Sequence, residues 1–155
     1  MSAASQIAFK NKLKQFCQHT IEKRINVAQE AMRQAQEAAN HEEKSSAGDK
    51  YETARAMGHL QKDMHARQIS EYKKELAALY AINVMTVYDT VQPGCFFETA
   101  AVSFFVAAGL GKQLVDKKTI LFLSAAAPLA LALKEKRVGD RFNFSGSVVT
   151  ISVLY

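Results

Sequence analysis

Apolar side chains recur every three or four positions through the first 41 residues of this chain. This spacing predicts one amphipathic helix over about residues 5–41, because an α-helix repeats its face every 3.6 residues. A second stretch, ending near residue 80, has the same periodicity. Neither stretch contains proline, and the second has Gly58 as its only glycine. We expect the apolar face of the second helix to carry Ala54, Met57, Leu60, Met64, Tyr72, Leu76 and Leu79.

A short polar segment, residues 45–52, separates the two predicted helices and holds two carboxylates three residues apart, Asp49 and Glu52. Two long helices joined by a short break predict an antiparallel coiled-coil hairpin over residues 1–80, with this acidic segment as its tip. Each arm is roughly 50 Å long at 1.5 Å per residue. The apolar face narrows to alanine toward the tip, at Ala31, Ala35 and Ala38, which lets the helix backbones approach closely. We therefore expect the distal hairpin to serve reach rather than stability.

The pattern changes after residue 80 to short apolar runs rich in Phe, Val and Ile, punctuated by glycine and Asp-Lys turns. Such runs are typical of strands, and Pro128 suits the first turn of a short helix over 129–134. Residues 81–155 thus predict a small antiparallel sheet with one helix, and the whole chain an α+β fold. Residues 119–133 are nearly all apolar but too short to span a bilayer, so we expect no membrane segment. The runs lie at 84–91, 95–98, 102–107, 119–123, 141–144 and 148–154, the last two forming a closing hairpin.

Composition narrows the function classes. The 155 residues carry a net charge of +5, divided as +3 over residues 1–77 and +2 over residues 78–155, so no basic block indicates nucleic-acid binding. Cys17 and Cys95 lack CxxC spacing and fit a reducing cytoplasm better than a disulfide or zinc site. The N-terminus does not have the pattern of a signal peptide, so we expect a cytoplasmic protein. His41, His59 and His65 lack a matching ligand set and are expected to be ordinary surface residues.

Two motifs resemble those of the bacterial transcript-cleavage factors GreA and GreB. Residues 127–140 read Ala-Pro-Leu-Ala-Leu-Ala-Leu-Lys-Glu-Lys-Arg-Val-Gly-Asp, similar to the family signature Ser-Pro-Leu-Gly-x-Ala-Leu-x-Gly-Lys-x-Val-Gly-Asp. Residues 48–52, Gly-Asp-Lys-Tyr-Glu, resemble the family's Gly-Asp-x-x-Glu-Asn tip. In that family the tip ends an N-terminal antiparallel coiled coil, and the signature lies in a C-terminal domain of FKBP-like fold. The resemblance therefore implies a coiled-coil hairpin over 1–80 and an FKBP-like domain over 81–155.

The resemblance implies a transcription elongation factor that binds RNA polymerase and inserts its coiled coil into the secondary channel. Asp49 and Glu52 would then help to hold the second Mg²⁺ of the polymerase and orient the water that cleaves backtracked RNA near its 3′ end. No intrinsic cofactor, no active site within this chain and a monomeric state are expected. Candidates for RNA contact at the tip are Lys44, Lys50, Tyr51 and Arg55, and candidates for polymerase contact are Pro128, Leu129, Gly139 and Asp140. The alternatives are that the flanking lysines are simply solvated and that Tyr51 packs against Met57 or Ala54, and for Tyr51 packing is favoured.

The chain also departs from the family pattern. Thr53 replaces the asparagine after the tip glutamate, Ala54-Arg55-Ala56 replaces Ala-Glu-Tyr, Ala127 replaces the serine, and Glu135 replaces the second glycine of the signature. These departures leave open a regulator that occupies the channel without promoting cleavage.

Two further readings need no polymerase chemistry at the tip. The chain can be a self-assembling coiled-coil adaptor with no role at the polymerase. Asp49 and Glu52 also have the spacing of a capping box, which would begin the second helix without further function. Capping and metal roles are compatible, because a capping carboxylate keeps acceptor capacity.

Overall fold

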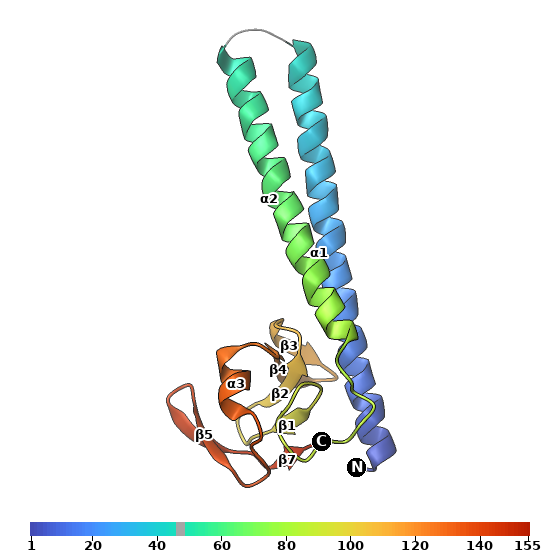
Figure 1. Ribbon diagram of the computed structural model, residues 1–155, viewed down its shortest axis with the longest axis vertical. Coiled ribbons are helices and arrows are strands. Elements are labelled where there is room, and N and C mark those ends of the chain that lie inside the picture. Colours follow the sequence, from blue (N-terminus) through green and yellow to red (C-terminus); the bar gives the residue numbers. More distant parts are fainter. Residues whose placement is uncertain (46–48) are drawn as a thin grey trace. The chain divides into compact units, whose positions relative to one another are not determined.

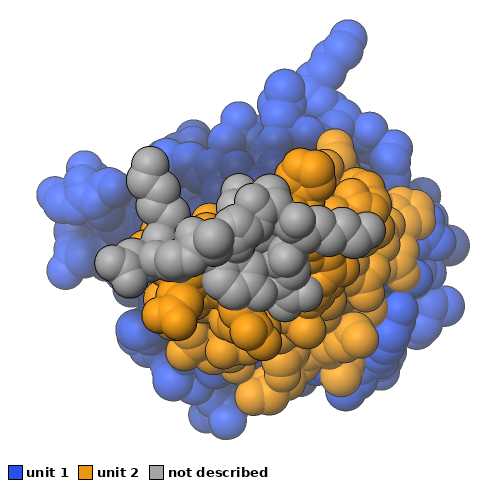
Figure 2. Space-filling model, turned by 90° about the horizontal axis from the view of Figure 1, so that it is seen from above, with its two compact units in different colours: residues 1–18, 78–155 blue, residues 19–77 orange. Residues whose placement is uncertain are grey.

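The computed structural model describes the backbone of residues 1–45 and 49–155, and the side chains of residues 1–41 and 52–155. Two long helices, α1 (Ala3–Ser45) and α2 (Asp49–Tyr80), precede two small sheets and one short helix (Figure 1). The predicted α+β class is confirmed. The chain divides into two compact units, residues 19–77 and residues 1–18 with 78–155, which are coloured separately in Figure 2.

Within residues 19–77, α1 and α2 pack as the predicted hairpin (Figure 1). Its seam on α2 is made by buried or half-buried residues spaced seven apart: Gly58, His65 and Tyr72 in one row, Ile69 and Leu76 in the other. A seven-residue repeat keeps the same face of a helix toward its neighbour. The matching residues of α1 are Ile21, Ile25, Ala28, Met32, Ala35 and Ala39, all buried or half-buried.

The two helices approach most closely where their residues are smallest. A Cβ atom placed on Gly58 would lie 3.2 Å from the Cβ of Ala39, which is tighter than an ordinary packing contact. The prediction that small residues let the backbones come together is confirmed at this point. Glycine is disfavoured inside helices, so its presence here has a packing reason.

Three residues of α2 that were expected in the seam lie outside it, and so does Ala38 of α1, which is exposed. Met57, Leu60 and Met64 are 57%, 66% and 52% exposed, so their assignment to the seam was wrong. Met57 and Met64 each precede a seam residue, Gly58 and His65, by one position, and one position turns a helix by about 100°. In each of these two pairs, the smaller or more polar residue lies in the seam, and the methionine is exposed.

The main sheet has five strands in the order β3-β4-β2-β1-β7. The pair β2–β4 is parallel and the other pairs are antiparallel, so the prediction of a purely antiparallel sheet was wrong for that pair. After β2 the chain forms the β3–β4 hairpin, which places β4 beside β2 and running in the same direction. The strands are β1 (Phe96–Glu98), β2 (Ser103–Ala107), β3 (Gly111–Val115), β4 (Lys118–Ser124) and β7 (Val153–Leu154).

Both faces of this sheet are covered within the unit formed by residues 1–18 and 78–155. On one face, the Phe9 and Phe16 rings of α1 lie 5.2 Å and 5.4 Å from the rings of Phe96 and Phe122. On the other face, Phe97 stacks on Phe104 at 4.7 Å. Because both faces are buried, the strands read as continuous apolar runs rather than alternating ones. The second face packs with α3 (Pro128–Leu133) and the hairpin of β5 (Arg141–Phe144) and β6 (Ser147–Thr150), through Ala130, Leu133 and Phe142.

Two tight turns connect neighbouring strands. Ser145 and Gly146, between β5 and β6, have φ of +51° and +80°, and Asp116 and Lys117, between β3 and β4, have φ of +51° and +64°. Two consecutive positive φ values match the twist of a β-hairpin. The predicted closing hairpin is confirmed for β5 and β6, whereas β7 leaves it and pairs with β1. The strand β3 was missed, because its glycine was interpreted as punctuation.

Residues 84–91, which were interpreted as β-rich, form no strand. Their backbone is held by Lys10 of α1, whose Nζ donates to the carbonyl oxygens of Thr86 at 2.6 Å and Gly94 at 3.0 Å. The Nζ also lies 4.6 Å from the centroid of the Tyr88 ring. Lys10 is completely buried, and burial lowers its pKa to about 8. A buried cation therefore joins the start of α1 to this segment.

We expect Lys10→Met to lower the free energy of unfolding by about 1–3 kcal/mol at pH 7, because two carbonyl oxygens lose their donor. The folded pKa of about 8 lies below the unfolded value of 10.5, so the unfolded state binds more protons between these pH values. The contribution of Lys10 to stability should therefore increase as pH rises through this window, so the difference in stability between wild type and the variant should widen. Urea unfolding at pH 7 and pH 10.5 measures both effects.

Lys112→Met, at an exposed position of β3, serves as the control for Lys10 and should change stability little at either pH. Equal stability of Lys10→Met and wild type at both pH values would contradict the assigned role.

The close approach at Gly58 predicts that Gly58→Leu is less stable than Gly58→Ala by about 1–2 kcal/mol. Leucine and alanine have similar helix propensities, so the comparison isolates overpacking against Ala39. At exposed Ala56, the change to leucine should cost under about 0.5 kcal/mol. Thermal unfolding followed by circular dichroism tests this, and equal melting of both Gly58 variants would refute the close packing.

Candidate functional site

The predicted acidic tip joins α1, which ends at Ser45, to α2, which begins at Asp49. Asp49 and Glu52 both belong to the first turn of α2, and residues three apart on a helix are neighbours. The side chains of Lys44, Asp49, Lys50 and Tyr51 lie outside the described residues. Their predicted roles, including the cap by Asp49, therefore stay predictions.

Glu52 and Arg55 are the two predicted tip residues whose side chains are described, and both are exposed. Ala54, between them, is half-buried and begins the seam. The first turns of α2 therefore combine a packed side with a side on which a carboxylate and a guanidinium face solvent. An exposed carboxylate keeps its acceptor oxygens accessible, which is the chemistry that a divalent cation needs.

The C-terminal motif begins at α3. Pro128 occupies the first position of this helix, where its missing N–H costs no hydrogen bond. Pro128 is exposed, and Leu129 is half-buried against the core. The predicted short helix is thus confirmed, and it begins and ends one residue earlier than expected. Leu129 is anchored in the core, whereas Pro128 is accessible to solvent.

The motif ends in a turn at Val138, Gly139 and Asp140. Gly139 has φ of +94°, a left-handed conformation that favours glycine, and its N–H donates to the carbonyl of Ile151 at 2.8 Å. The Asp140 carboxylate accepts from the backbone N–H of Arg137 at 2.7 Å. Ile151 in turn donates to the Asp140 carbonyl at 3.0 Å. Gly139 and Asp140 therefore shape this turn, and the Asp140 side chain stays exposed.

Glu135 lies just after α3 and has φ of +71°. This left-handed conformation costs an ordinary residue roughly 1–2 kcal/mol, and helices commonly end on glycine in it. Glu135 donates its N–H to the carbonyl of Val91 at 2.9 Å, and Val91 donates to the carbonyl of Lys136 at 2.8 Å. These paired bonds hold the segment after α3 in place, so the strained backbone of Glu135 is imposed by its surroundings.

The cysteines offer no nucleophile. Cys17 and Cys95 are free and fully buried, and burial raises their pKa to about 12 and about 11, respectively. A buried thiol with a raised pKa is unreactive near neutral pH. Among the side chains that the structure describes, no three His, Cys, Asp or Glu residues gather as metal ligands.

One histidine is not the surface residue that the sequence predicted. His65 occupies the seam of the hairpin, and its Nδ1 is buried without a hydrogen-bond partner in the described part of the chain. Its spacing of seven from Gly58 and Tyr72 was the signal that could have identified this position.

A scan of protein-family models gives no match to this chain, and a search of proteins with curated function gives none either. Of the helices described, none has both the length and the apolar character required to cross a membrane.

The positive φ of Glu135 predicts that Glu135→Gly raises the free energy of unfolding by about 0.5–1 kcal/mol, since glycine adopts this conformation without strain. Lys134→Gly is the matched control, because Lys134 has φ of –50° and should lose stability with glycine. Chemical denaturation measures both. Destabilisation of both variants to the same degree would contradict the strain at Glu135.

Proposed function

We propose that this protein is a transcription elongation factor similar to the Gre family. It would bind RNA polymerase, insert the α1–α2 hairpin into the secondary channel, and promote cleavage of backtracked RNA through Asp49 and Glu52. The order of a long helical hairpin followed by a small β-rich unit supports this proposal. An FKBP-like fold of the β-rich unit is part of the same proposal.

The observation that carries the proposal is the backbone at two positions where the family signature has glycine. Gly139 keeps the glycine and has φ of +94°, whereas Glu135 has lost it and still has φ of +71°. Asp116, Lys117 and Ser145 also have positive φ, but they lie in two-residue hairpin turns that require it, whereas Glu135 follows a helix at the position where the signature has glycine. The retained backbone therefore supports descent from the signature even where the residue differs.

The dimensions of the hairpin fit the proposed insertion. The 32 residues of α2 span roughly 48 Å at 1.5 Å per residue. The seam narrows to Gly58 and Ala39 toward the tip, which keeps this part of the hairpin slender. A slender pair of helices can enter a channel that excludes a folded domain.

The tip residues have the oxygen donors that the proposed chemistry requires. Mg²⁺ prefers carboxylate and water ligands and keeps several waters, so one or two added carboxylates are sufficient. When bound in the polymerase, this ion polarises the RNA phosphodiester and lowers the pKa of the attacking water. Asp49 and Glu52 would hold that ion and orient the water, and Lys44, Lys50, Tyr51 and Arg55 would contact the RNA.

The β-rich unit would supply contacts with the polymerase. Pro128 and Asp140 are exposed, and both lie on backbone fixed by hydrogen bonds or by the core. Leu129 and Gly139 hold the two ends of this motif in shape. Exposed residues on fixed backbone bind a partner with little loss of conformational entropy.

A channel regulator that does not promote cleavage is the second candidate. The replacement of asparagine by Thr53, and of Ala-Glu-Tyr by Ala54-Arg55-Ala56, favours it, because these residues follow the tip directly. Both candidates require the same polymerase complex and differ only in whether the tip positions the ion and the water.

The double variant Asp49→Asn/Glu52→Gln should slow RNA cleavage in a stalled, backtracked polymerase complex at least tenfold, because neutral amides are poorer ligands of Mg²⁺. Its affinity for core polymerase and its melting temperature should match those of wild type. Asp63→Asn/Glu75→Gln, which alters two exposed carboxylates farther along α2, is the matched control and should cleave normally.

Three other results are informative. Absence of binding between wild type and core polymerase would refute the proposal. Binding without any cleavage by wild type would establish the channel regulator instead. A lower melting temperature of Asp49→Asn/Glu52→Gln with normal cleavage would assign both residues to helix capping alone.

A further inference from the structure

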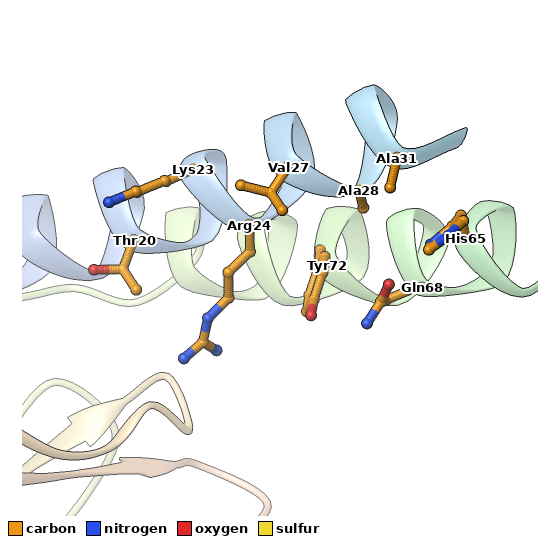
Figure 3. A pocket seen from close by; sticks show the side chains of 9 residues that line it. All are labelled: Thr20, Lys23, Arg24, Val27, Ala28, Ala31, His65, Gln68 and Tyr72. Atoms are coloured by element: carbon orange, nitrogen blue, oxygen red, sulfur yellow. The ribbon is translucent and has the colours of Figure 1, made fainter. Parts of the chain in front are cut away.

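A groove runs between α1 and α2 within residues 19–77 and encloses about 310 Å³. Its lining includes the small apolar residues Ala28 and Ala31 from α1 and the ring of Tyr72 from α2 (Figure 3). The side chains of Arg24, Gln68 and Tyr72 point to the same side of the hairpin in that view. The remaining lining residues are Thr20, Lys23, Val27 and His65.

The exposed apolar residues of α2 continue this groove along the helix. Gln68 lines the groove, and Met64 and Met57 precede it by four and eleven residues, which places them on the same face of α2. Leu60 lies between them, three residues after Met57. Val27, on the side of the groove that α1 forms, is 62% exposed. We call Val27, Met57, Leu60 and Met64 together with the groove the apolar flank of the hairpin.

The flank has cations at one end and no acid in the groove. Lys23 and Arg24 line the groove, and neither makes an ion pair or hydrogen bond to a residue that the structure describes. None of the nine lining residues is Asp or Glu. By contrast, Arg33 on the same helix pairs with Glu30 and Glu37. The groove therefore offers positive charge beside apolar surface.

One lining residue also has a buried polar atom without a partner. The Nδ1 of His65 is buried with no hydrogen bond to the described residues. An unsatisfied buried polar atom costs about 1–3 kcal/mol.

We propose that the apolar flank binds an amphipathic α-helix of RNA polymerase that has acidic residues near one end. Met57, Leu60 and Met64 are spaced three and four residues apart, the ridge pattern that packs against a second helix. The row from Met57 to Tyr72 spans 15 positions, or roughly 22 Å. Lys23 and Arg24 then pair with the acidic end. The inference rests on the proposed function, because it names the polymerase as the partner.

A second copy of this chain fits the flank less well. A two-fold dimer places the same patch on both sides of its interface, so Lys23 and Arg24 would need acids on the same flank. Glu71, the acid next to Tyr72, is already paired with Lys74. The three exposed side chains of α2 present only roughly a few hundred Å² of apolar surface, below the ~800 Å² per partner of a stable interface. A dimer held by the flank alone would be weak, whereas a polymerase helix on the flank would add to the proposed contacts of the β-rich unit.

The test compares full-length variants for binding to purified core polymerase. Leu60→Gln/Met64→Gln and Lys23→Gln/Arg24→Gln should each weaken binding at least tenfold, and Lys23→Gln/Arg24→Gln should also reduce its salt dependence. The matched control is Lys62→Gln/Lys73→Gln. Lys73 lines a surface on α2 that shares no residue with the groove, and Lys62 precedes it by eleven residues on the same face. This control should bind within twofold of wild type.

A photo-crosslinker at Gln68 identifies the occupant. We expect it to mark a polymerase segment with apolar residues at helical spacing and acids within one turn. Variants that bind like the control, or a crosslink to an extended or basic segment, would overturn the flank proposal and leave the proposed function standing. Absence of wild-type binding would overturn both. A wild-type dimer in sedimentation that Leu60→Gln/Met64→Gln dissociates would assign the flank to self-association instead.

Discussion

Close packing of two helix backbones is the constraint on which the hairpin depends. At Gly58 and Ala39 there is no room for a larger side chain. The rows Gly58–His65–Tyr72 and Ile69–Leu76 face α1 and so fix the rotation of α2 about its own axis. That rotation decides which residues are hidden. It buries a histidine and a glycine, and it leaves Met57, Leu60 and Met64 exposed on the flank. A seam with few large apolar residues stabilises the hairpin weakly. This composition suits a hairpin that serves reach rather than the stability of the fold.

The other unit of the chain is held by stronger interactions. Phenylalanine rings fill both faces of its sheet, and buried Lys10 ties the first turns of α1 to the segment before β1. The turn at Gly139 and the strained backbone of Glu135 belong to this rigid unit. A unit held by many interactions and a slender hairpin with carboxylates at its tip would suit the proposed factor, which anchors on one surface of a partner and acts at another. This difference between the two units supports the proposed function.

Periodicity was enough to predict the hairpin, its approximate ends and the α+β class. It failed at Met57 and Met64, because hydrophobicity favours burial of these residues, whereas close backbone approach required glycine at position 58. It also failed for β3 and for residues 84–91. β3 has one buried residue, Val115, and so no apolar run, and residues 84–91 are held by a lysine from a distant part of the chain. Such long-range contacts have no local signature.

The candidate site was predictable only in part. The turn at Gly139 and the helix at Pro128 followed from local residue preferences. The groove beside His65 did not, since it requires the relative rotation of two helices. The strain at Glu135 was also hidden, because a glutamate gives no sign of a left-handed backbone.

In the proposed function, the hairpin tip reaches the catalytic centre of RNA polymerase. An iron chelate attached to a cysteine introduced at position 52 tests it directly, because Cys17 and Cys95 are buried and should not be labelled. In a complex with core polymerase, hydroxyl radicals from the chelate should cut the polymerase chain beside its bound Mg²⁺ and the RNA near its 3′ end. Cuts confined to the outer surface of the polymerase, or no cuts in a complex that forms, would contradict the account.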